Sequence, residues 1–395
     1  MMPRMQVDIG WGDLAAGLAA CVIRAPKADA RGTLLTRRPD SLTCLSVRSG
    51  LDLLFAERAW PPGSEVLVSA ITIPDMSRIL REHGLVPVPV DVDPETLAVR
   101  DEAWQRAWTP RTRAVLIAHL FGSRLSLDGL LRWAQARDLM VLEDCAQAFA
   151  GDGWTGDPRS DLRLFSFGPI KTATALGGAI LLVKDAALRA RLRRRQTTWP
   201  VQSTASFLRR VLKFTALKPL QSNRGYALLV AVLRLLGRDH DEAVRTMARG
   251  FAGGDFFHRL RHRPCAALIR LLERRLRTYD SRHVEQRRHV GAALQSQLST
   301  VRPLGASAPG FNYWVFPLRV ADREAVMHRL WAEGFDATCG ASSLHAVPAP
   351  EGHAEPVAAR DAMRSVLYIP AYPAMGSARL ARLAQVLNDV ARPPA

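Results

Sequence analysis

The sequence predicts an α/β fold in which a large layered domain with a mostly parallel sheet is followed by a smaller C-terminal α/β domain. Short apolar runs alternate with amphipathic helical patterns over the first half of the 395 residues, which is typical of a layered sheet. Near Arg193 this alternation gives way to closely spaced apolar and basic residues, which indicate an inserted helical unit. Strand–helix patterning returns after residue 312, which predicts the second domain.

Apolar runs in the first half are expected to be strands. They occupy residues 65–70, 86–90, 114–118, 140–142, 162–167 and 179–183. Pro87 and Pro89 cannot donate hydrogen bonds to a neighbouring strand, so the second run is expected at an edge of the sheet. Helical patterns lie between strands at 77–83, which Gly84 ends, and at 127–137. Ligands of such sheets bind beyond the carboxyl ends of the strands.

The insert has its own helical pattern. Phe207, Val211 and Leu217 recur at helical spacing with basic residues among them. Residues 226–236 are nearly all apolar except for Arg234. These patterns predict two helices of an inserted unit.

The rest of the chain returns to regular alternation. The expected elements are long helices over 268–298, a strand at 313–320, and helices at 323–331 and 380–390. The expected division is a large domain 1–194, a basic amphipathic helical insert 195–257, linking helices 258–290 and a small C-terminal domain 291–395.

Composition and cysteine usage are those of an ordinary globular protein in a reducing compartment. Hydrophobic residues make up 48% and charged residues 23%, which does not suggest disorder or a fibre. The five cysteines are scattered without CxxC or Cys/His metal spacing, so no structural metal is expected. The N-terminus lacks the apolar region of a signal peptide and no apolar run could span a bilayer, so we expect a cytoplasmic protein.

The net charge of +17 belongs to one segment. Residues 189–288 contain 24 Lys and Arg against 7 Asp and Glu, a surplus that accounts for the whole net charge. The rest of the chain is therefore neutral, and the basic character calls for an explanation within this segment.

Four interpretations of the basic insert remain open. Its arginines could form the solvated face of helices that cap the core. Apolar stripes interleaved with Arg and Lys also suit contact of residues 195–257 with an anionic membrane surface, at the inner face of the membrane. Arginines could instead hold the phosphates of an anionic substrate. Nucleic-acid binding through the same charge ranks last and is not the expected interpretation, because no recognised nucleic-acid module accompanies the charge.

Lys171 and Asp144 are the first candidates for catalysis. Lys171 is one of only five lysines and ends the phrase FSFGPIK, and Asp144 precedes it by 27 positions in the phrase EDCAQ. A lysine that can form a Schiff base, together with an acid that can hold a pyridinium nitrogen, is what pyridoxal phosphate (PLP) chemistry requires. Both residues lie just beyond the ends of expected strands.

Further motifs occur in a consistent order along the chain. They are Ser49-Gly50 before an apolar helix, PGSEV at 62–66, Thr72, PVPVDVD at 87–93, HLFG at 119–122, EDCAQA at 143–148, the phrase ending at Lys171, Gly177-Gly178, and AAL at 266–268. Their order and spacing resemble the DegT/StrS-type family of PLP-dependent sugar aminotransferases. The resemblance covers most of the chain and implies PLP fold type I, with a three-layer αβα large domain.

The resemblance implies roles for three residues around the cofactor ring. Lys171 would hold PLP as a Schiff base and then move a proton between the amino-bearing carbon and the cofactor. Asp144 would keep the pyridine nitrogen protonated, so that the ring acts as an electron sink. Gln147 would hydrogen-bond the phenolic oxygen of the cofactor.

A phosphate site and a homodimer are implied in the same way. Ser166 would donate to the phosphate, joined by backbone N–H groups near Ser49 and Gly50 at a helix N-terminus. In this family the neighbouring subunit completes the phosphate site. Alignment on the AAL run places His258 and Arg261 near the position that makes this contribution.

Three positions depart from the family pattern. Leu51 stands where the family usually has a threonine hydroxyl for the phosphate, and Gly168 stands where it usually has a histidine. Ile73 occupies the cofactor-binding position at which an aromatic residue usually stacks on the pyridine ring. Because Lys171 and Asp144 are retained, these departures bear on the substrate and on the surroundings of the cofactor.

The resemblance implies an aminotransferase that acts on a keto-sugar, nucleotide-linked in the usual members, or on a related carbonyl precursor. Glutamate is the expected amino donor, and a cell-surface polysaccharide or a specialised metabolite is the expected pathway. One alternative is a PLP enzyme of the same fold with another reaction or with a non-sugar or lipid-linked substrate. Another is a degenerate, non-catalytic scaffold associated with a membrane.

Overall fold

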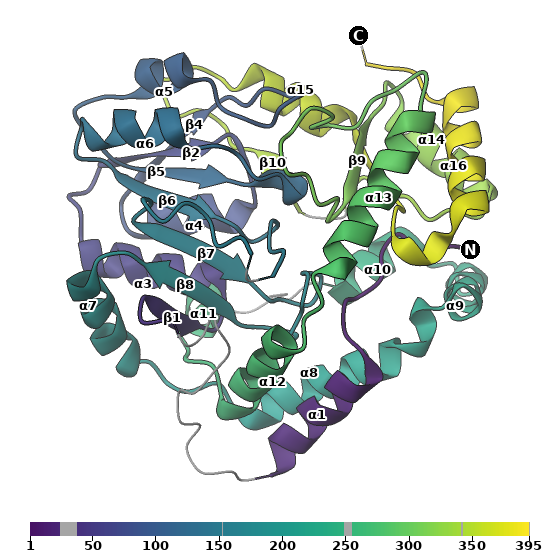
Figure 1. The fold of residues 1–395 in the computed structure, drawn as a ribbon, viewed down its shortest axis with the longest axis horizontal. Coiled ribbons are helices and arrows are strands. Elements are labelled where there is room, and N and C mark those ends of the chain that lie inside the picture. Colours follow the sequence, from purple (N-terminus) through teal and green to yellow (C-terminus); the bar gives the residue numbers. More distant parts are fainter. Residues whose placement is uncertain (24–37, 152, 249–254, 341–342, 395) are drawn as a thin grey trace.

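A computed structural model describes residues 1–23, 38–151, 153–248, 255–340 and 343–394 (Figure 1). Its centre is a seven-stranded sheet in the order β1-β8-β7-β6-β5-β2-β4. The strands are β1 (Ser41–Cys44), β2 (Glu65–Ser69), β4 (Val86–Val90), β5 (Thr112–Ala118), β6 (Met140–Asp144), β7 (Leu162–Ser166) and β8 (Ala179–Val183). The five strands from β4 to β7 run parallel, whereas β8 runs antiparallel to both β7 and β1. The proline-rich strand β4 lies at an edge, as predicted.

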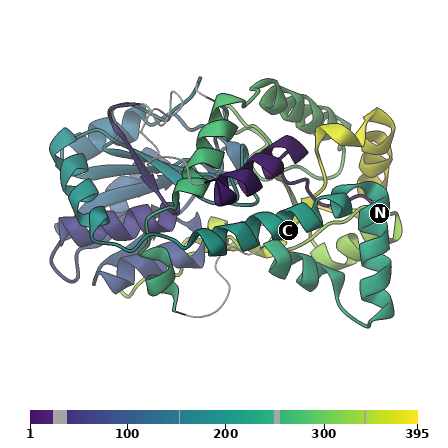
Figure 2. The same cartoon turned by 90° about the horizontal axis from the view of Figure 1, so that it is seen from below.

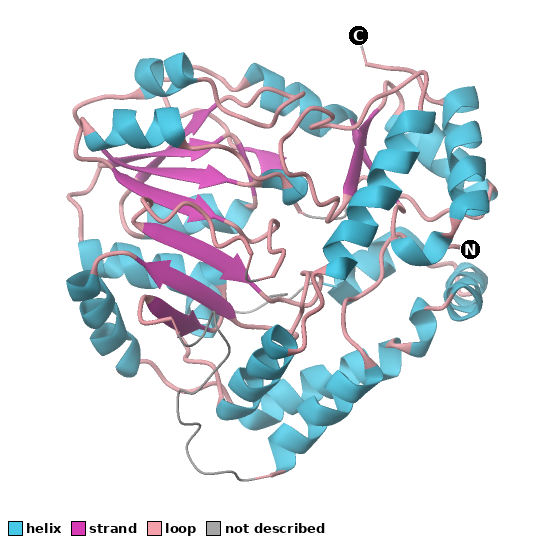
Figure 3. Cartoon of the chain, viewed as in Figure 1, coloured by secondary structure: helices cyan, strands magenta, loops and turns pink. Residues whose placement is uncertain are grey.

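Helices cover both faces of the sheet, so the three-layer αβα expectation is confirmed (Figures 1 and 3). The helices of this domain are α3 (Val47–Arg58), α4 (Pro74–Glu82), α5 (Asp101–Ala107), α6 (Asp128–Gln135) and α7 (Ala186–Thr197). Val66 and Leu116 face the core beneath α3, α4 and α7, while Leu67 and Val115 face the core beneath α5 and α6. Strands that are buried on both faces explain the continuous apolar runs of the sequence.

The small domain contains β9 (Phe316–Arg319), α14 (Arg323–Ala332), α15 (Val357–Ser365), β11 (Val366–Ile369) and α16 (Ser377–Val390). It pairs a short antiparallel sheet with α14 and α16 in one core, whereas buried residues of its helix α15 pack with those of the large domain. A two-residue strand β10 (His345–Ala346) pairs with β3 (Ile71–Thr72) of the large domain and joins the two units. The long helical pattern after residue 268 is two helices, α12 (Ala266–Arg277) and α13 (Arg282–Gln297), with a break between them.

The insert is helical and packs against the body of the protein (Figure 2). Its helices are α8 (Thr204–Leu217), α9 (Asn223–Leu235), α10 (His240–Ala248) and the short α11 (Phe256–Leu260). Phe207, Val211 and Phe214 of α8 are buried with residues of α12 and of the N-terminal helix α1 (Trp11–Val22) in one core. The part of the expected insert at 249–254 lies outside the described residues. No helix within the described residues is long and apolar enough to cross a membrane.

Candidate active site

The candidate residues gather at the carboxyl ends of two neighbouring parallel strands. Asp144 is the last residue of β6 and Ser166 is the last residue of β7. The two strands pair in parallel with Asp144 opposite Leu164, so their ends open at the same edge of the sheet. Lys171 lies on the loop that follows β7, and this loop returns to β8 through Gly177 and Gly178. The fold therefore brings the lysine and the acid to one place.

Lys171 is partly buried and lies against an aromatic ring. Its Nζ is 4.0 Å from the centre of the Trp314 ring, and the indole N–H of Trp314 donates to the Ile170 carbonyl at 2.9 Å. Burial lowers the pKa of Lys171 to about 8; the nearby Asp144 opposes this shift and Arg48 adds to it. A lowered pKa leaves a useful fraction of the amine neutral near pH 7, and the neutral amine is the form that attacks a carbonyl.

Asp144 is buried at the floor of the site. Burial raises the pKa of its carboxyl, although the Ala146 N–H that donates to Oδ1 at 2.9 Å lowers it, as do the charges of Lys171, His119 and Arg48. A buried carboxyl is stabilised by a cationic partner. A protonated pyridine nitrogen is such a partner, so the residue fits the role that the family resemblance implies.

Gln147 reaches the HLFG turn. Its Oε1 accepts a hydrogen bond from the Phe121 N–H at 2.8 Å, which leaves its amide NH₂ group as the donor that a cofactor oxygen requires. Gly122 in this turn has φ of +102°, and a Cβ there would lie 1.8 Å from Oδ1 of Asn312. The motif therefore shapes a turn in which only glycine fits. His119, before the turn, is a buried core histidine that contacts Glu143 through Nε2 and accepts from the Leu125 N–H through Nδ1.

Ser166, the last residue of β7, directly precedes the loop that carries Lys171. A Cβ placed on Gly168 would lie 3.7 Å from Oγ of Ser166 and 4.0 Å from Cγ of Lys171. The hydroxyl and the lysine therefore flank the same glycine, and the small residue at 168 leaves the space between them open.

The helix that was expected to begin after Ser49-Gly50 begins earlier, so this expectation was wrong. Helix α3 starts at Val47 with Ser46 as its N-cap, whose Oγ accepts from the Ser49 N–H at 3.1 Å and lies 2.9 Å from Oγ of Ser49. A Cβ on Gly50 would lie 2.6 Å from the Leu181 side chain, so this glycine allows the close packing of α3 on β8. Ser49 and Gly50 are thus buried residues within the first turn of α3, and their N–H groups donate to Oγ and to the carbonyl of Ser46.

Arg48 is the residue that the sequence interpretation missed. It occupies the first turn of α3, and its Nε donates to Oδ2 of Asp75 in the first turn of α4 at 2.5 Å. Its charge lowers the pKa of both Asp144 and Lys171, which makes the guanidinium a further candidate for the site. The available signal was an arginine two positions after a serine N-cap, since anions bind at helix N-termini.

Ile73, His258 and Arg261 are the remaining predicted residues. Ile73 is the N-cap residue of α4, partly buried against the core of the large domain. His258 is exposed on α11 and packs edge-on against His262. Arg261 forms ion pairs with Asp52 at 2.9 Å and with Glu82, the last residue of α4, at 3.3 Å. Within one chain the fold does not bring His258 or Arg261 to Lys171.

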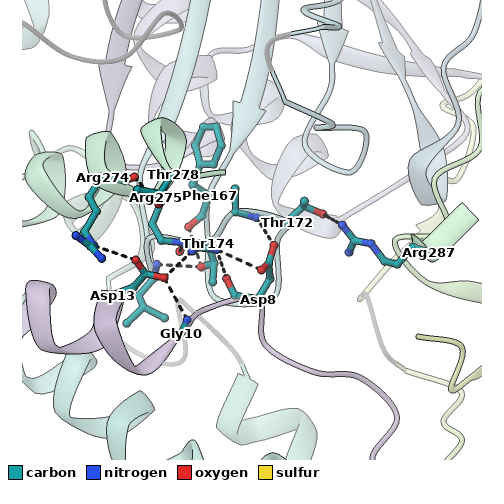
Figure 4. A network of polar contacts seen from close by, with 12 residues as sticks. Asp8, Gly10, Asp13, Phe167, Thr172, Thr174, Arg274, Arg275, Thr278 and Arg287 are labelled. Atoms are coloured by element: carbon teal, nitrogen blue, oxygen red, sulfur yellow. Dashed lines mark hydrogen bonds and ion pairs between the residues drawn. The ribbon is translucent and has the colours of Figure 1, made fainter. Parts of the chain in front are cut away.

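A buried polar network holds the lysine loop in place (Figure 4). Arg275 of α12 donates from Nε to the Thr174 carbonyl at 3.0 Å, from Nη1 to Asp13 at 2.6 Å and from Nη2 to the Asp8 carbonyl at 2.6 Å. Asp8 in turn accepts from the Ala173 N–H at 2.7 Å, and Oγ1 of Thr174 donates to the Gly168 carbonyl at 2.6 Å. The loop is therefore fixed at both sides of Lys171.

A cavity beside Lys171 opens between the N-terminal segment and the small domain. Trp314, Arg287 and Tyr372 are among its lining residues. Nη2 of Arg287 donates to Oγ1 of Thr172, next to the lysine, at 3.1 Å. A cationic and aromatic lining at the reactive amine suits a polar, anionic substrate.

The family profile of the DegT/DnrJ/EryC1/StrS aminotransferases matches residues 35–388. The chain belongs to this family. Its members depend on PLP, so the cofactor that the sequence predicted is confirmed at the level of the family.

Two curated relatives match part of the chain. A UDP-N-acetyl-3-dehydro-alpha-D-glucosamine 3-aminotransferase from Acidithiobacillus ferrooxidans is 37% identical over 151 residues, which is 37% of this chain and 41% of the relative. An L-glutamine:2-deoxy-scyllo-inosose aminotransferase from Micromonospora echinospora is 35% identical over 137 residues, which is 33% of this chain and 31% of the relative. The alignments thus span less than half the length of either relative.

Solved structures show the same fold over nearly the whole chain. The aminotransferase TlmJ from Streptoalloteichus hindustanus superposes with a TM-score of 0.72 at 19% identity, covering 98% of each chain. The sugar aminotransferase CalS13 from Micromonospora echinospora gives a TM-score of 0.67 at 19% identity, covering 99% of this chain and 100% of its own. NtdA from Bacillus subtilis, solved with bound cofactor PMP, gives 0.66 at 15% identity, covering 98% of this chain and 85% of its own. The expected PLP fold type I is therefore confirmed.

Proposed function

We propose that this protein is a PLP-dependent aminotransferase that replaces the carbonyl oxygen of a keto-sugar with an amino group. The observation that carries the proposal is the meeting of a lysine of lowered pKa with a buried acid at one sheet edge, in a chain of this family. When bound, PLP would supply the electron sink for the reaction.

Each residue has a separate task in this proposal. The amine of Lys171 would hold the cofactor covalently and, once displaced by substrate, would move a proton at the amino-bearing carbon. Asp144 would pair with the ring nitrogen, and the NH₂ group of Gln147 would donate to the phenolic oxygen. Ser166 and the first turn of α3 would hold the phosphate, with Arg48 as its counter-charge.

The substrates are proposed by class. A nucleotide-linked keto-sugar is supported by the first relative, whose name describes a UDP-linked sugar, and by the cationic lining beside Lys171. Glutamate is the proposed amino donor, and it would leave as 2-oxoglutarate. We also propose a cytoplasmic homodimer, because Arg48 and Asp75 at the cofactor end are partly exposed in one chain and His258 is exposed.

Absorbance spectroscopy tests the cofactor site and the reaction in sequence. Added PLP should give the visible band of lysine-bound cofactor in the native protein and not in the Lys171→Ala variant. Glutamate should then bleach the band, and addition of a UDP-linked keto-sugar should restore it, with the aminated sugar detected by mass spectrometry. Persistence of the band with both glutamate and glutamine would contradict transamination and favour another PLP reaction. Absence of any band would overturn the proposed site.

A further inference from the structure

Helix α9 has two apolar faces, and only one of them is buried. Tyr226, Val230 and Leu233 recur at helical spacing and face the protein. On the opposite side Leu228 is 63% exposed, Val232 43% and Leu235 87%. Leu236, which caps the helix, is 65% exposed and extends the same apolar surface. A helix that is apolar all round is normally covered on all sides, so the outer face of α9 lacks the cover that its composition calls for.

The orientation of α9 is fixed by a buried polar network. The hydroxyl of Tyr226 donates to Oδ2 of Asp336 in the small domain at 2.5 Å. Asp336 also accepts two hydrogen bonds from Arg4, at 2.6 and 2.9 Å. The burial of Tyr226 and Asp336 holds the inner face in place, so the outer face points away from the protein at its periphery (Figures 1 and 2).

The charge around this face has one sign. Residues 222–238, which contain α9 and its two ends, include three Arg and no Asp or Glu, and the first acid beyond them is the exposed Asp239. Arg224 lies at the start of α9, Arg234 in its last turn and Arg238 just beyond its end, and all three are exposed. Long basic side chains can keep their charged ends at phosphate groups while an apolar stripe between them enters a lipid layer.

We propose that the outer face of α9 docks on the surface of an anionic lipid bilayer. Leu228, Val232 and Leu235 would enter the boundary between headgroups and acyl chains, and the arginines would pair with lipid phosphates. Charge complementarity selects this occupant, because a predominantly basic rim around an apolar stripe is the pattern of an interfacial helix. The proposal is independent of the reaction and places the enzyme at a membrane surface without a spanning segment.

Point variants are the appropriate test. Deletion of the insert would also remove Phe207 and Val211 from the core of the protein, so lost binding could reflect unfolding. The variant Leu228→Gln/Val232→Gln/Leu235→Gln changes exposed side chains alone. Val357→Gln on α15, whose side chain is 49% exposed on another surface, is the matched control.

Flotation with vesicles provides the measurement. The native protein should float with vesicles of phosphatidylcholine and phosphatidylglycerol and not with phosphatidylcholine alone, and added salt should weaken the binding. The triple variant should bind the anionic vesicles at least about tenfold more weakly than the native protein, with an unchanged melting temperature. Val357→Gln should bind them like the native protein.

Three outcomes would overturn the proposal: no flotation of the native protein, equal flotation with neutral vesicles, or undiminished flotation of the triple variant. A change of oligomeric state in the triple variant, measured by light scattering without lipid, would also overturn it and assign the face to contact between copies.

Discussion

Two buried arginines, Arg275 and Arg4, stabilise different parts of the structure. Arg275 donates to the backbone carbonyls of Thr174 and Asp8 as well as to Asp13, so it fixes the path of the chain around the lysine. Arg4 donates to the carboxylates of Asp336 and Asp241, so it fixes how separate units dock. Here the contacts of Arg275 to the backbone fix a loop, whereas the contacts of Arg4 to carboxylates join the N-terminal segment to the small domain and the insert.

The N-terminal segment joins the two networks. Arg4 belongs to the network of the small domain and the insert, and Asp8 belongs to the network of the lysine loop. The Met2 N–H donates to the Gly334 carbonyl at 2.7 Å and anchors the start of the chain on the small domain. Movement of the small domain would therefore be transmitted through the N-terminal segment to the loop that carries Lys171.

The largest effect is expected from Arg275→Ala. Removal of the guanidinium leaves buried Asp13 without a partner on that side and frees the carbonyl of Thr174, which should cost about 3–5 kcal/mol of unfolding free energy. Because the loop of Lys171 loses its support, PLP affinity should fall as well. Urea unfolding and PLP titration measure the two effects. Arg274→Ala, which removes a half-exposed partner of Asp13, is the control with an expected loss of about 0–1 kcal/mol. An unchanged PLP affinity in Arg275→Ala would contradict the positioning role.

The Asp336→Asn variant should separate docking from cofactor binding. The substitution keeps the shape of the side chain but removes the charge opposite Arg4. It should lower the free energy of unfolding by about 2–3 kcal/mol and leave PLP affinity unchanged. Burial opposes but does not outweigh the hydrogen bonds and charges of His240, Arg4 and Tyr226, so the pKa of Asp336 is lowered.

The sign of the pH dependence follows from this shift. A carboxyl of lowered pKa contributes stability above its unfolded pKa of about 4 and loses it as the pH falls toward the folded value. Native protein should therefore lose stability below about pH 4 more steeply than Asp336→Asn in urea unfolding series. Parallel curves for the two proteins would show that this carboxyl does not drive the acid loss.

The phosphate role of Arg48 can be tested with two forms of the cofactor. Arg48→Ala should weaken PLP binding by about 10–100-fold, equal to about 1.4–2.7 kcal/mol, through loss of a charge-assisted contact. Binding of pyridoxal, which lacks the phosphate, should change little. Arg48→Lys should retain part of the PLP affinity. Equal losses for PLP and pyridoxal in fluorescence titrations would instead indicate contact with the ring.

An effect on stability alone is expected at Gly50. In Gly50→Ala the new Cβ would meet Leu181, and overpacking of this kind costs about 1–3 kcal/mol. Adding Leu181→Ala should recover part of the loss, because it removes the side chain that clashes. The melting temperature should fall, whereas PLP affinity in a titration should stay unchanged, because the Gly50 N–H already donates to the Ser46 carbonyl within the helix. A large loss of PLP affinity would instead indicate that Gly50 contributes to the cofactor site.

The sequence interpretation succeeded where local pattern decides structure. Continuous apolar runs predicted the buried parallel strands, and Pro87 and Pro89 predicted the edge strand. The phrase around Lys171 and the acid at the end of β6 were found because residue type and spacing carried the signal. The start of α3 was misjudged, because Ser46 and Ser49 both suit an N-cap and only the packing of Gly50 on Leu181 separates them.

The sequence by itself determined the alternation of elements, the family, and the lysine and acid on which the chemistry rests. The tertiary structure alone decided three features. The charge of Arg48 acts on this pair, Arg275 donates to the carbonyl of Thr174, 101 residues before it, and one face of α9 stays exposed. The physical reason is range. Helix and strand periodicity acts between neighbours along the chain, whereas burial, and with it pKa and ion pairing, depends on segments that meet only after folding.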